Sequence, residues 1–323
     1  MRGSRSLVWL MVLALGAHSG AALAQSYPSR PLRLVVGFAP GGGADINARL
    51  LAPKLAELLG QPVIVDNRSG AGARIAHELV AKSAPDGYTL LLTTPSVTTS
   101  MALYKKLPYD TLRDFAPVSM FSTGPLILVI HTSVPAKNLQ ELIALAHAKP
   151  GALTYASAGT GTGQHLGGEI FKLRTATDLL HVPYKGTGPA LAALIAGEVN
   201  MSFTTIQAVA PHVRAGRLRP LASAGEKRSE LMPDVPTMAE AGVRGVVAAI
   251  WYGVLAPAAT PREIIQTLAR AVIKLANQPD LRQRILDQGA EPVGSTPEEF
   301  GRVLRDEVAQ WTEVVRASGI QVE

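Results

Sequence analysis

Short apolar runs alternate along this chain with helical patterns, and turns rich in glycine separate them. The first unit is the apolar run 32–38, a turn of proline and glycine, and the helical pattern 46–59. The strand pattern 63–66, the helical pattern 76–82 and the strand pattern 88–93 follow it. A strand that is joined to the next strand through a helix is the repeating unit of a parallel sheet. The alternation therefore predicts an α/β fold, with a mostly parallel sheet flanked by helices.

One residue conflicts with this pattern, because Pro53 lies inside the helical pattern 46–59. Proline has no backbone N–H, and its ring clashes with the preceding turn of a helix. We therefore expect the helix that ends before Gly60 to be kinked or split at Pro53.

The same alternation occurs a second time in the middle of the chain. Helical patterns cover residues 139–148, 165–173, 190–196 and 209–215, and strand patterns cover residues 153–156, 179–182, 199–203 and 218–222. A chain of 323 residues is longer than a single hydrophobic core usually supports. We therefore predict two lobes of the same architecture, with room for a cleft between them.

Two apolar stretches suit the connections between the lobes. The stretch 118–131 is interrupted by Gly124 and Pro125, as expected for a segment that leaves one lobe and enters the other. The stretch 251–256 suits the return, so we place a hinge near Gly124 and Ala249. The predicted lobes are residues 25–125 together with 250–323, and residues 126–249.

The N-terminal residues 1–24 have the pattern of a secretory signal peptide. Arg2 and Arg5 precede the apolar run 7–15, and small residues precede the predicted cleavage after Ala24. No later stretch approaches the roughly 20 apolar residues that a membrane-spanning helix requires. We therefore expect a secreted, soluble protein.

The composition excludes several classes of protein. The chain has no cysteine, which rules out disulfides, thiolate metal sites and thiol nucleophiles. Its formal charge of +6 is a mild excess of base, and the basic residues are scattered. The densest basic segment, 214–228, lacks the interleaved aromatic residues that stack on bases. Nucleic acid is therefore not an expected partner.

Common catalytic and cofactor motifs are also absent. The spacing G-x-G-x-x-G fails at every glycine cluster, and neither G-x-x-x-x-G-K nor G-x-S-x-G occurs. His77 and Glu78 begin like a zinc-protease motif, but position 81 is alanine. We expect no cofactor and no metal ion.

Two glycine loops are the main candidates for a binding site. Each follows a predicted strand, and ligands in open α/β sheets bind beyond the carboxyl ends of the strands. Glycines let backbone amides approach an anion, and the helix that follows adds unpaired amides and a positive dipole end. The candidate residues are Pro40, Gly41, Gly42, Gly43 and Asp45 in the first loop and Ser157, Gly159, Thr160, Gly161, Thr162 and His165 in the second.

Further candidates lie at the ends of other predicted strands. They are Thr94, Ser96, Tyr184, Lys185, Thr204 and Thr205. The glycine loops contain neither arginine nor lysine, which favours a compact carboxylate over a phosphate chain, and a dicarboxylate could span both loops.

Several of these residues also have a purely structural interpretation. The glycines could serve tight turns alone, and Asp45 could be the N-cap of its helix. His165 could be a packing residue, Tyr184 could pack against the sheet, and Lys185 could be a solvated surface charge. The sequence alone leaves these alternatives open.

Many short motifs occur in an order that is typical of one family. They are Tyr27-Pro28-x-Arg30-Pro31, Phe38-Ala39-Pro40-Gly41-Gly42-Gly43-x-Asp45, Pro85-Asp86-Gly87-Tyr88, Leu107-Pro108-Tyr109-Asp110, His181-Val182-Pro183-Tyr184-Lys185-Gly186, Val235-Pro236-Thr237-Met238-Ala239-Glu240-Ala241-Gly242 and Trp251-Tyr252-Gly253. With them the chain resembles the Bug-type receptors of tripartite tricarboxylate transporters over essentially its whole mature length.

The resemblance implies a two-lobed periplasmic-binding-protein fold of the Venus-flytrap, type II-like kind. It implies a periplasmic receptor whose lobes close on a small organic acid, often through water-bridged carboxylate contacts, and deliver it to a membrane permease of the tripartite tricarboxylate type. We expect a monomer and no catalysis.

Two departures from the family pattern bear on the ligand. Many relatives carry Asp after the Phe of the strand in the second lobe, whereas this chain has Thr204, which makes an amino-acid ligand less expected. The usual Gly-Ala-Gly-Gly turn reads Gly70-Ala71-Gly72-Ala73-Arg74 in this chain, which puts Arg74 near the end of the second strand, where it could pair with a distal carboxylate or face solvent. The alternative function is a periplasmic enzyme that uses His165 or Asp45 as an acid or base on a small carboxylate.

Overall fold

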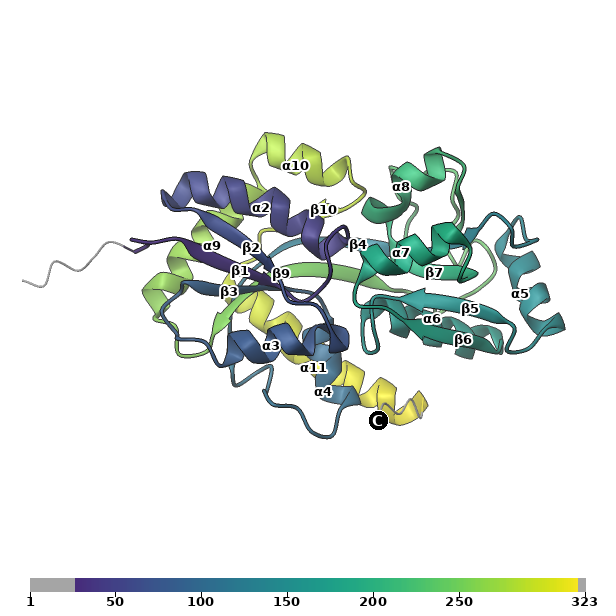
Figure 1. The fold of residues 1–323 in the computed structure, drawn as a ribbon, viewed down its shortest axis with the longest axis horizontal. Coiled ribbons are helices and arrows are strands. Elements are labelled where there is room, and N and C mark those ends of the chain that lie inside the picture. The colour runs from purple at the N-terminus through teal and green to yellow at the C-terminus, as the bar shows by residue number, and fades with distance from the viewer. Residues whose placement is uncertain (1–26, 319–323) are drawn as a thin grey trace, which may run out of the picture.

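One mixed sheet of ten strands runs through the whole molecule. The computed structural model describes residues 27–318, so the predicted signal peptide lies outside the described residues. The strand order is β2-β1-β3-β9-β4-β7-β5-β6, and β8 and β10 also pair with β4. Helices cover both faces, and the elements fall into two groups that β4 and β9 join (Figure 1).

The elements follow one another in the predicted alternation. The strands are β1 (Leu32–Val36), β2 (Val63–Asn67), β3 (Thr89–Thr93), β4 (Phe115–His131), β5 (Leu153–Ser157), β6 (Leu179–Pro183), β7 (Met201–Thr205), β8 (Leu218–Ser223), β9 (Ala249–Pro257) and β10 (Glu291–Pro292). The α-helices are α2 (Gly43–Leu59), α3 (Arg74–Ala81), α4 (Ser96–Leu103), α5 (Leu139–Ala148), α6 (Gly163–Thr175), α7 (Thr187–Ala196), α8 (Ile206–Arg214), α9 (Arg262–Ala276), α10 (Pro279–Leu286) and α11 (Pro297–Ser318). A short 3₁₀ helix, η1 (Ala71–Ala73), precedes α3.

Each half of the sheet contains one set of parallel strands. In one half, β1 pairs in parallel with β2 and β3. In the other half, β5 pairs in parallel with β6 and β7. The strands β4 and β9 run antiparallel to their neighbours and to each other. The sheet is therefore mixed, because the two crossing strands add antiparallel pairs to each parallel set.

The partners of β4 change between Pro125 and Leu126. Up to Pro125 the strand pairs with β9, and from Leu126 onward it pairs with β7 and β8. Gly124 and Pro125 thus lie inside one continuous strand. The change of partners falls at the boundary predicted from the sequence, although the division into two lobes remains a prediction.

Alternating side chains of the first half build a core on each face of the sheet. Leu34 and Val36 pack with residues of α2 and α9, whereas Val35 packs with residues of α3, α4 and α11. In the second half, Ile127 packs with residues of α7 and α8, and Leu128 lies in the cluster that includes residues of α5 and α6. Successive side chains of a strand point to opposite faces of the sheet, and both faces are covered here. Apolar residues therefore run without a break in these strands.

The expected split of one helix was wrong, and another helix was not predicted. The helix α2 is not split but runs as one helix through Pro53, because Pro53 lies on its exposed face, where water can hydrate the carbonyl that loses its donor. The helix α4 was missed altogether. Most of its residues are buried, so it lacks the polar face that makes an amphipathic helix recognisable.

Candidate functional site

Five strands end at the junction between the two halves, and each leads directly into a helix. They are β1 before α2, β3 before α4, β5 before α6, β6 before α7 and β7 before α8. The two predicted glycine loops are the first and third of these connections. The junction therefore gathers the amino ends of helices from both halves, where unpaired backbone N–H groups favour negative charge.

A small cavity lies between these loops. It is lined by Phe38, Gly42, Ala44, Thr94, Ala158, Thr162, Gln164, Thr187, Ile250 and Tyr252. None of these lining residues is charged. The volume that the centre of a water molecule can occupy in this cavity is about 20 Å³. This is room for about one water.

The loops of the two halves touch around this cavity. The backbone N–H of Ala39 donates to the carbonyl of Lys185 at 3.1 Å. The hydroxyl of Thr99 on α4 donates to the carbonyl of Gly161. A Cβ atom at position 42 would lie only 2.9 Å from Cβ of Thr187. The halves therefore approach each other closely enough to require glycine at this contact.

Four of the five converging helices, α2, α4, α7 and α8, start without a side-chain cap hydrogen bond. The N-caps of α2 and α7 are Gly42 and Gly186, and neither has a side chain that could accept a hydrogen bond from the first turn. In contrast, α6 is capped by Thr162, whose hydroxyl accepts from the N–H of His165 at 3.4 Å. The amino ends of α2 and α7 therefore keep donors for an anion.

Comparison with known proteins gives one family. Residues 47–320 match the model of the tripartite tricarboxylate transporter family receptor. The chain is 41% identical over 302 residues to protein BugT of Bordetella pertussis, which covers 93% of each chain.

This chain belongs to the tripartite tricarboxylate transporter receptor family. It is a periplasmic solute-binding receptor of that transport family and not an enzyme.

Solved structures of similar receptors share the fold. The periplasmic binding protein BugD is 31% identical, with a TM-score of 0.89 over 92% of this chain and 100% of BugD. The R. palustris protein Rpa4515 with adipate is 37% identical, with a TM-score of 0.89 over 91% of this chain and 99% of that chain. MatC from Rhodopseudomonas palustris with bound malate is 34% identical, with a TM-score of 0.86 over 90% of this chain and 100% of MatC. The predicted α/β periplasmic-binding-protein fold is confirmed.

The hydrogen-bond partners of Asp45 in the receptor could not be predicted from the sequence. It is not the N-cap of α2, because the helix begins earlier, at Gly43. Its carboxylate accepts hydrogen bonds from the N–H of Gly41 at 3.1 Å, from Arg49 at 3.0 Å and from Asn67 at 3.1 Å. Burial raises the pKa of Asp45, but the bonds from Arg49, Gly41 and Asn67 outweigh burial and hold the pKa below its usual value. The carboxylate is charged and holds the first glycine loop in place.

His165 supports the second glycine loop of the receptor. Its Nδ1 accepts a hydrogen bond from the N–H of Gly161 at 3.3 Å, and its ring stacks on His181 with centroids 4.2 Å apart. The Nε2 of His181 lies 2.7 Å from the hydroxyl of Ser157. Burial lowers the pKa of His165, which keeps Nδ1 free to accept. Ser157 and His165 thus belong to one network beneath the loop.

Seven of the ten lining residues were not among the predicted site residues, and two of them are Gln164 and Tyr252. Gln164 is 1% exposed, accepts from the N–H of Ala158 at 2.7 Å and donates to Thr187 at 2.9 Å, so it ties two loops together. A polar residue two positions after the predicted binding residue Thr162 was the available signal. Tyr252 gave no such signal, because it lies in the strand β9, which was assigned only to the return crossing.

The other predicted residues have varied positions. Gly42, Thr94 and Thr162 line the cavity. Gly43 and Ser96 are buried in the first turns of α2 and α4, Gly159 and Gly161 have φ values of +130° and +83°, and Thr204 and Thr205 are the buried last residues of β7. Pro40, Gly41 and Lys185 are exposed, and Thr160 and Tyr184 are half-buried. Arg74 lies over the ring of Tyr104, 3.6 Å from its centroid.

Proposed function

We propose that this receptor binds a small organic carboxylate between the two halves, at the two glycine loops, and presents it to a membrane permease of the tripartite tricarboxylate type. The observation that carries the proposal is the convergence of uncapped helix ends on a small, uncharged cavity. The solved relatives with adipate and malate support a dicarboxylate as the ligand class.

The electrostatics of the cavity favour one carboxylate over more highly charged groups. Its lining offers hydroxyl and amide groups, such as Thr94, Thr187 and Gln164, but no arginine or lysine. Helix amino ends and neutral donors can hold a single carboxylate. A phosphate chain would bring more charge than these donors offset. The lining also holds no carboxylate that could pair with the ammonium group of an amino acid.

The small volume of the cavity implies movement during binding. A dicarboxylate with four to six carbons needs several times the space of about one water. The contacts between Ala39 and Lys185 and between Thr99 and Gly161 join the loops of the two halves beside the cavity. We therefore propose that the halves separate about the crossing strands, near Gly124 and Ala249, and close again on the acid.

A thermal-shift screen tests the proposed function. The mature receptor would be heated with mono-, di- and tricarboxylates of two to eight carbons, aromatic acids, amino acids and sugars. A ligand at a hundredfold excess over its dissociation constant adds about 2.7 kcal/mol, which raises the thermal midpoint by roughly 5 to 10 °C. We expect this rise with dicarboxylates and not with amino acids or sugars. Flat curves with protein that mass spectrometry shows to be free of carried-over ligand would contradict the proposal.

Replacement of Gly161 by valine is expected to weaken binding of the acid at least tenfold. Gly161 has φ +83°, a conformation that a branched residue rarely adopts, and a Cβ atom would lie 3.1 Å from Leu103. The strain should also lower the free energy of unfolding by about 1–3 kcal/mol. Calorimetric titration and denaturant unfolding measure the two effects.

Gly216 provides the matched control. Its φ is +68°, and no heavy atom lies within 4 Å of a Cβ at that position. Gly216→Val should therefore lose similar stability and keep full affinity. Equal affinities for Gly161→Val and Gly216→Val would show that the second loop does not contact the ligand.

A further inference from the structure

Three buried donor groups lie together without partners at the hinge side of the cavity. They are the hydroxyl of Tyr252, the hydroxyl of Thr205 and Nε2 of Gln207. Tyr252 is 1% exposed and Thr205 is 3% exposed. Most buried polar groups in folded proteins are hydrogen-bonded, because a buried group without a partner loses the free energy of hydration. Three such groups at one place indicate a site for a ligand atom.

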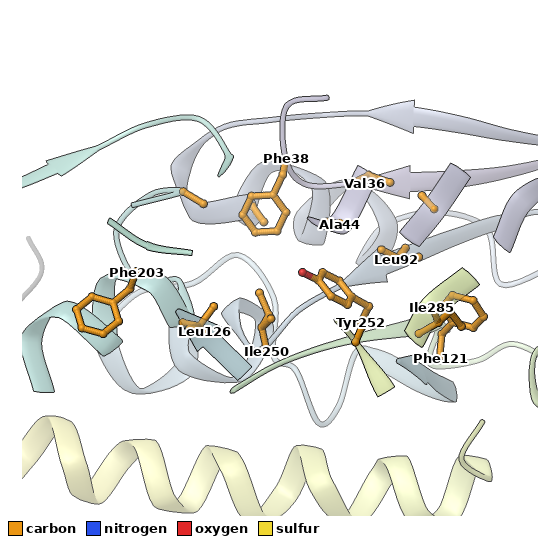
Figure 2. Packing of buried hydrophobic residues seen from close by; sticks show 14 of the residues in the cluster. Val36, Phe38, Ala44, Leu92, Phe121, Leu126, Phe203, Ile250, Tyr252 and Ile285 are labelled. Atoms are coloured by element: carbon orange, nitrogen blue, oxygen red, sulfur yellow. The ribbon is translucent and has the colours of Figure 1, made fainter. Parts of the chain in front are cut away.

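Tyr252 connects this cluster with the cavity at the glycine loops. Its side chain is directed from β9 toward Phe38 and Ala44 (Figure 2). Tyr252 lines that cavity and also a second, smaller cavity, whose wall includes Thr205 and Gln207. Ile250 lines both cavities as well. A Cβ atom at position 43 would lie 2.0 Å from the Tyr252 hydroxyl, so the hydroxyl also approaches the first turn of α2.

The cluster supplies donors and lacks charge. Burial raises the pKa of Tyr252 well above its usual value, so the phenol stays protonated. The two hydroxyls do not meet the geometry of a hydrogen bond with each other. Among the residues that line either cavity there is no aspartate, glutamate, lysine or arginine. A hydrogen-bond acceptor fits such a cluster, whereas an ammonium group would find no counter-charge.

Contacts with Asn47 orient the side-chain amide of Gln207. The Oε1 atom of Gln207 lies 3.5 Å from Nδ2 of Asn47, which donates to the carbonyl of Gly43 at 2.8 Å. The hydroxyl of Ser122 donates to Oδ1 of Asn47 at 2.6 Å. With its oxygen turned toward Asn47, the amide of Gln207 leaves its nitrogen available to a ligand.

We infer that Tyr252, Thr205 and Gln207 form a subsite, on the hinge side of the cavity and beside the first turn of α2, that binds a second oxygen acceptor of the ligand. The inference rests on the proposed function, because it assigns the second end of the same carboxylate ligand. The ligand class is then a small acid with a second carboxylate or another oxygen acceptor. A simple monocarboxylate of equal length leaves the three donors without a partner.

The test compares acids that differ only at the far end. Calorimetric titration would use each straight-chain diacid of four to eight carbons and the monoacid with the same number of carbons. Removal of one hydrogen bond to a charged group weakens binding by about tenfold to a hundredfold. We expect Tyr252→Phe and Thr205→Val each to weaken binding of the preferred diacid by roughly tenfold or more and to change binding of its monoacid by less than about threefold.

Stability measurements separate this role from a structural one. The hydroxyls of Tyr252 and Thr205 have no partner, so neither variant should lower the thermal midpoint of the ligand-free receptor. Tyr27→Phe is the matched control, because the Tyr27 hydroxyl donates to the carbonyl of Gly87 at 2.7 Å, away from the cavity. It should lower the midpoint and keep the full preference for the diacid.

The outcomes distinguish the inference from the function on which it rests. If the unmodified receptor prefers a diacid and both variants keep that preference, the subsite is wrong and the proposed function stands. If the unmodified receptor binds none of the acids, the proposed function fails and the subsite fails with it.

Discussion

Gly42→Val is expected to abolish binding of the acid while the receptor stays folded. Gly42 has φ −95°, which any residue adopts, so valine introduces no backbone strain. A Cβ atom at this position would nevertheless lie 2.9 Å from Cβ of Thr187 and 3.3 Å from its hydroxyl. The clash is between the two halves, and it arises only when the loops touch. The variant should therefore hold the halves apart. We expect the affinity for the acid to fall by a factor of about a hundred or more, which corresponds to about 3 kcal/mol of lost contact and steric strain.

The measurement is calorimetric titration of the receptor with its preferred dicarboxylate, together with the thermal midpoint of the ligand-free protein. Gly42→Ala and Gly301→Ala form a matched pair with the same chemical change. A Cβ at position 301, on α11, has its nearest neighbour at the ordinary distance of 3.4 Å, so this control should bind normally. Normal binding by Gly42→Val would mean that the acid is not held where the loops meet.

The second large effect is a loss of thermal stability between pH 7 and pH 4. Burial, with a smaller effect of Arg74, lowers the pKa of His77 to about 3. Burial, followed by the charges of His165 and Lys172, lowers the pKa of His181 to about 3. Histidine in the unfolded chain has a pKa near 6.5, so below that pH the unfolded state binds more protons than the folded state. Stability is therefore fully present above about pH 6.5 and is lost as the pH falls toward 3.

His77 accounts for most of this expected effect. It is completely buried, with one ring nitrogen 2.9 Å from the hydroxyl of Tyr109 and the other 2.9 Å from that of Thr93. Each pH unit between the two pKa values contributes about 1.4 kcal/mol, so acidification to pH 4 removes on the order of 3 kcal/mol. His181 is only half-buried and adds less. For a protein of this size the thermal midpoint should fall by roughly 5 to 10 °C.

Thermal unfolding at pH 7, 5.5 and 4 checks this expectation. The variant His77→Gln carries an uncharged amide that does not titrate in this range. It should be less stable at pH 7 and should show a shallower fall of the midpoint with acidification. Parallel curves for the variant and the unmodified receptor would assign the pH dependence to other groups.

The elements were largely predictable because their signals are local. The strand β1 and the helix α2 were expected from a run of apolar residues, a glycine turn and a helical period, and the same pattern identified β5 and α6. The helix α4 could not be recognised in this way. Its sequence has no polar face, and only the neighbouring β3, α3 and α11 explain why six of its eight residues are buried.

The candidate site was predictable only in part. Gly42 and Thr162 were found because a glycine loop before a helix is a local signal for an anion site. Asp45 was misassigned as a possible N-cap, since the sequence does not show that the helix begins at Gly43 and that Asn67 of β2 reaches its carboxylate. Arg49 one turn later was the local hint of this ion pair.

The sequence by itself determined the order of strands, glycine loops and helices, because hydrophobic period and turn chemistry act over a few neighbouring residues. Only the tertiary structure decided which side chains meet. Tyr252 and Thr205 lie 47 positions apart in the sequence, yet both line one small cavity, because β9 and β7 each pair with β4. Pairing between distant strands depends on the whole sheet, so no local pattern could place the tyrosine beside the amino end of α2.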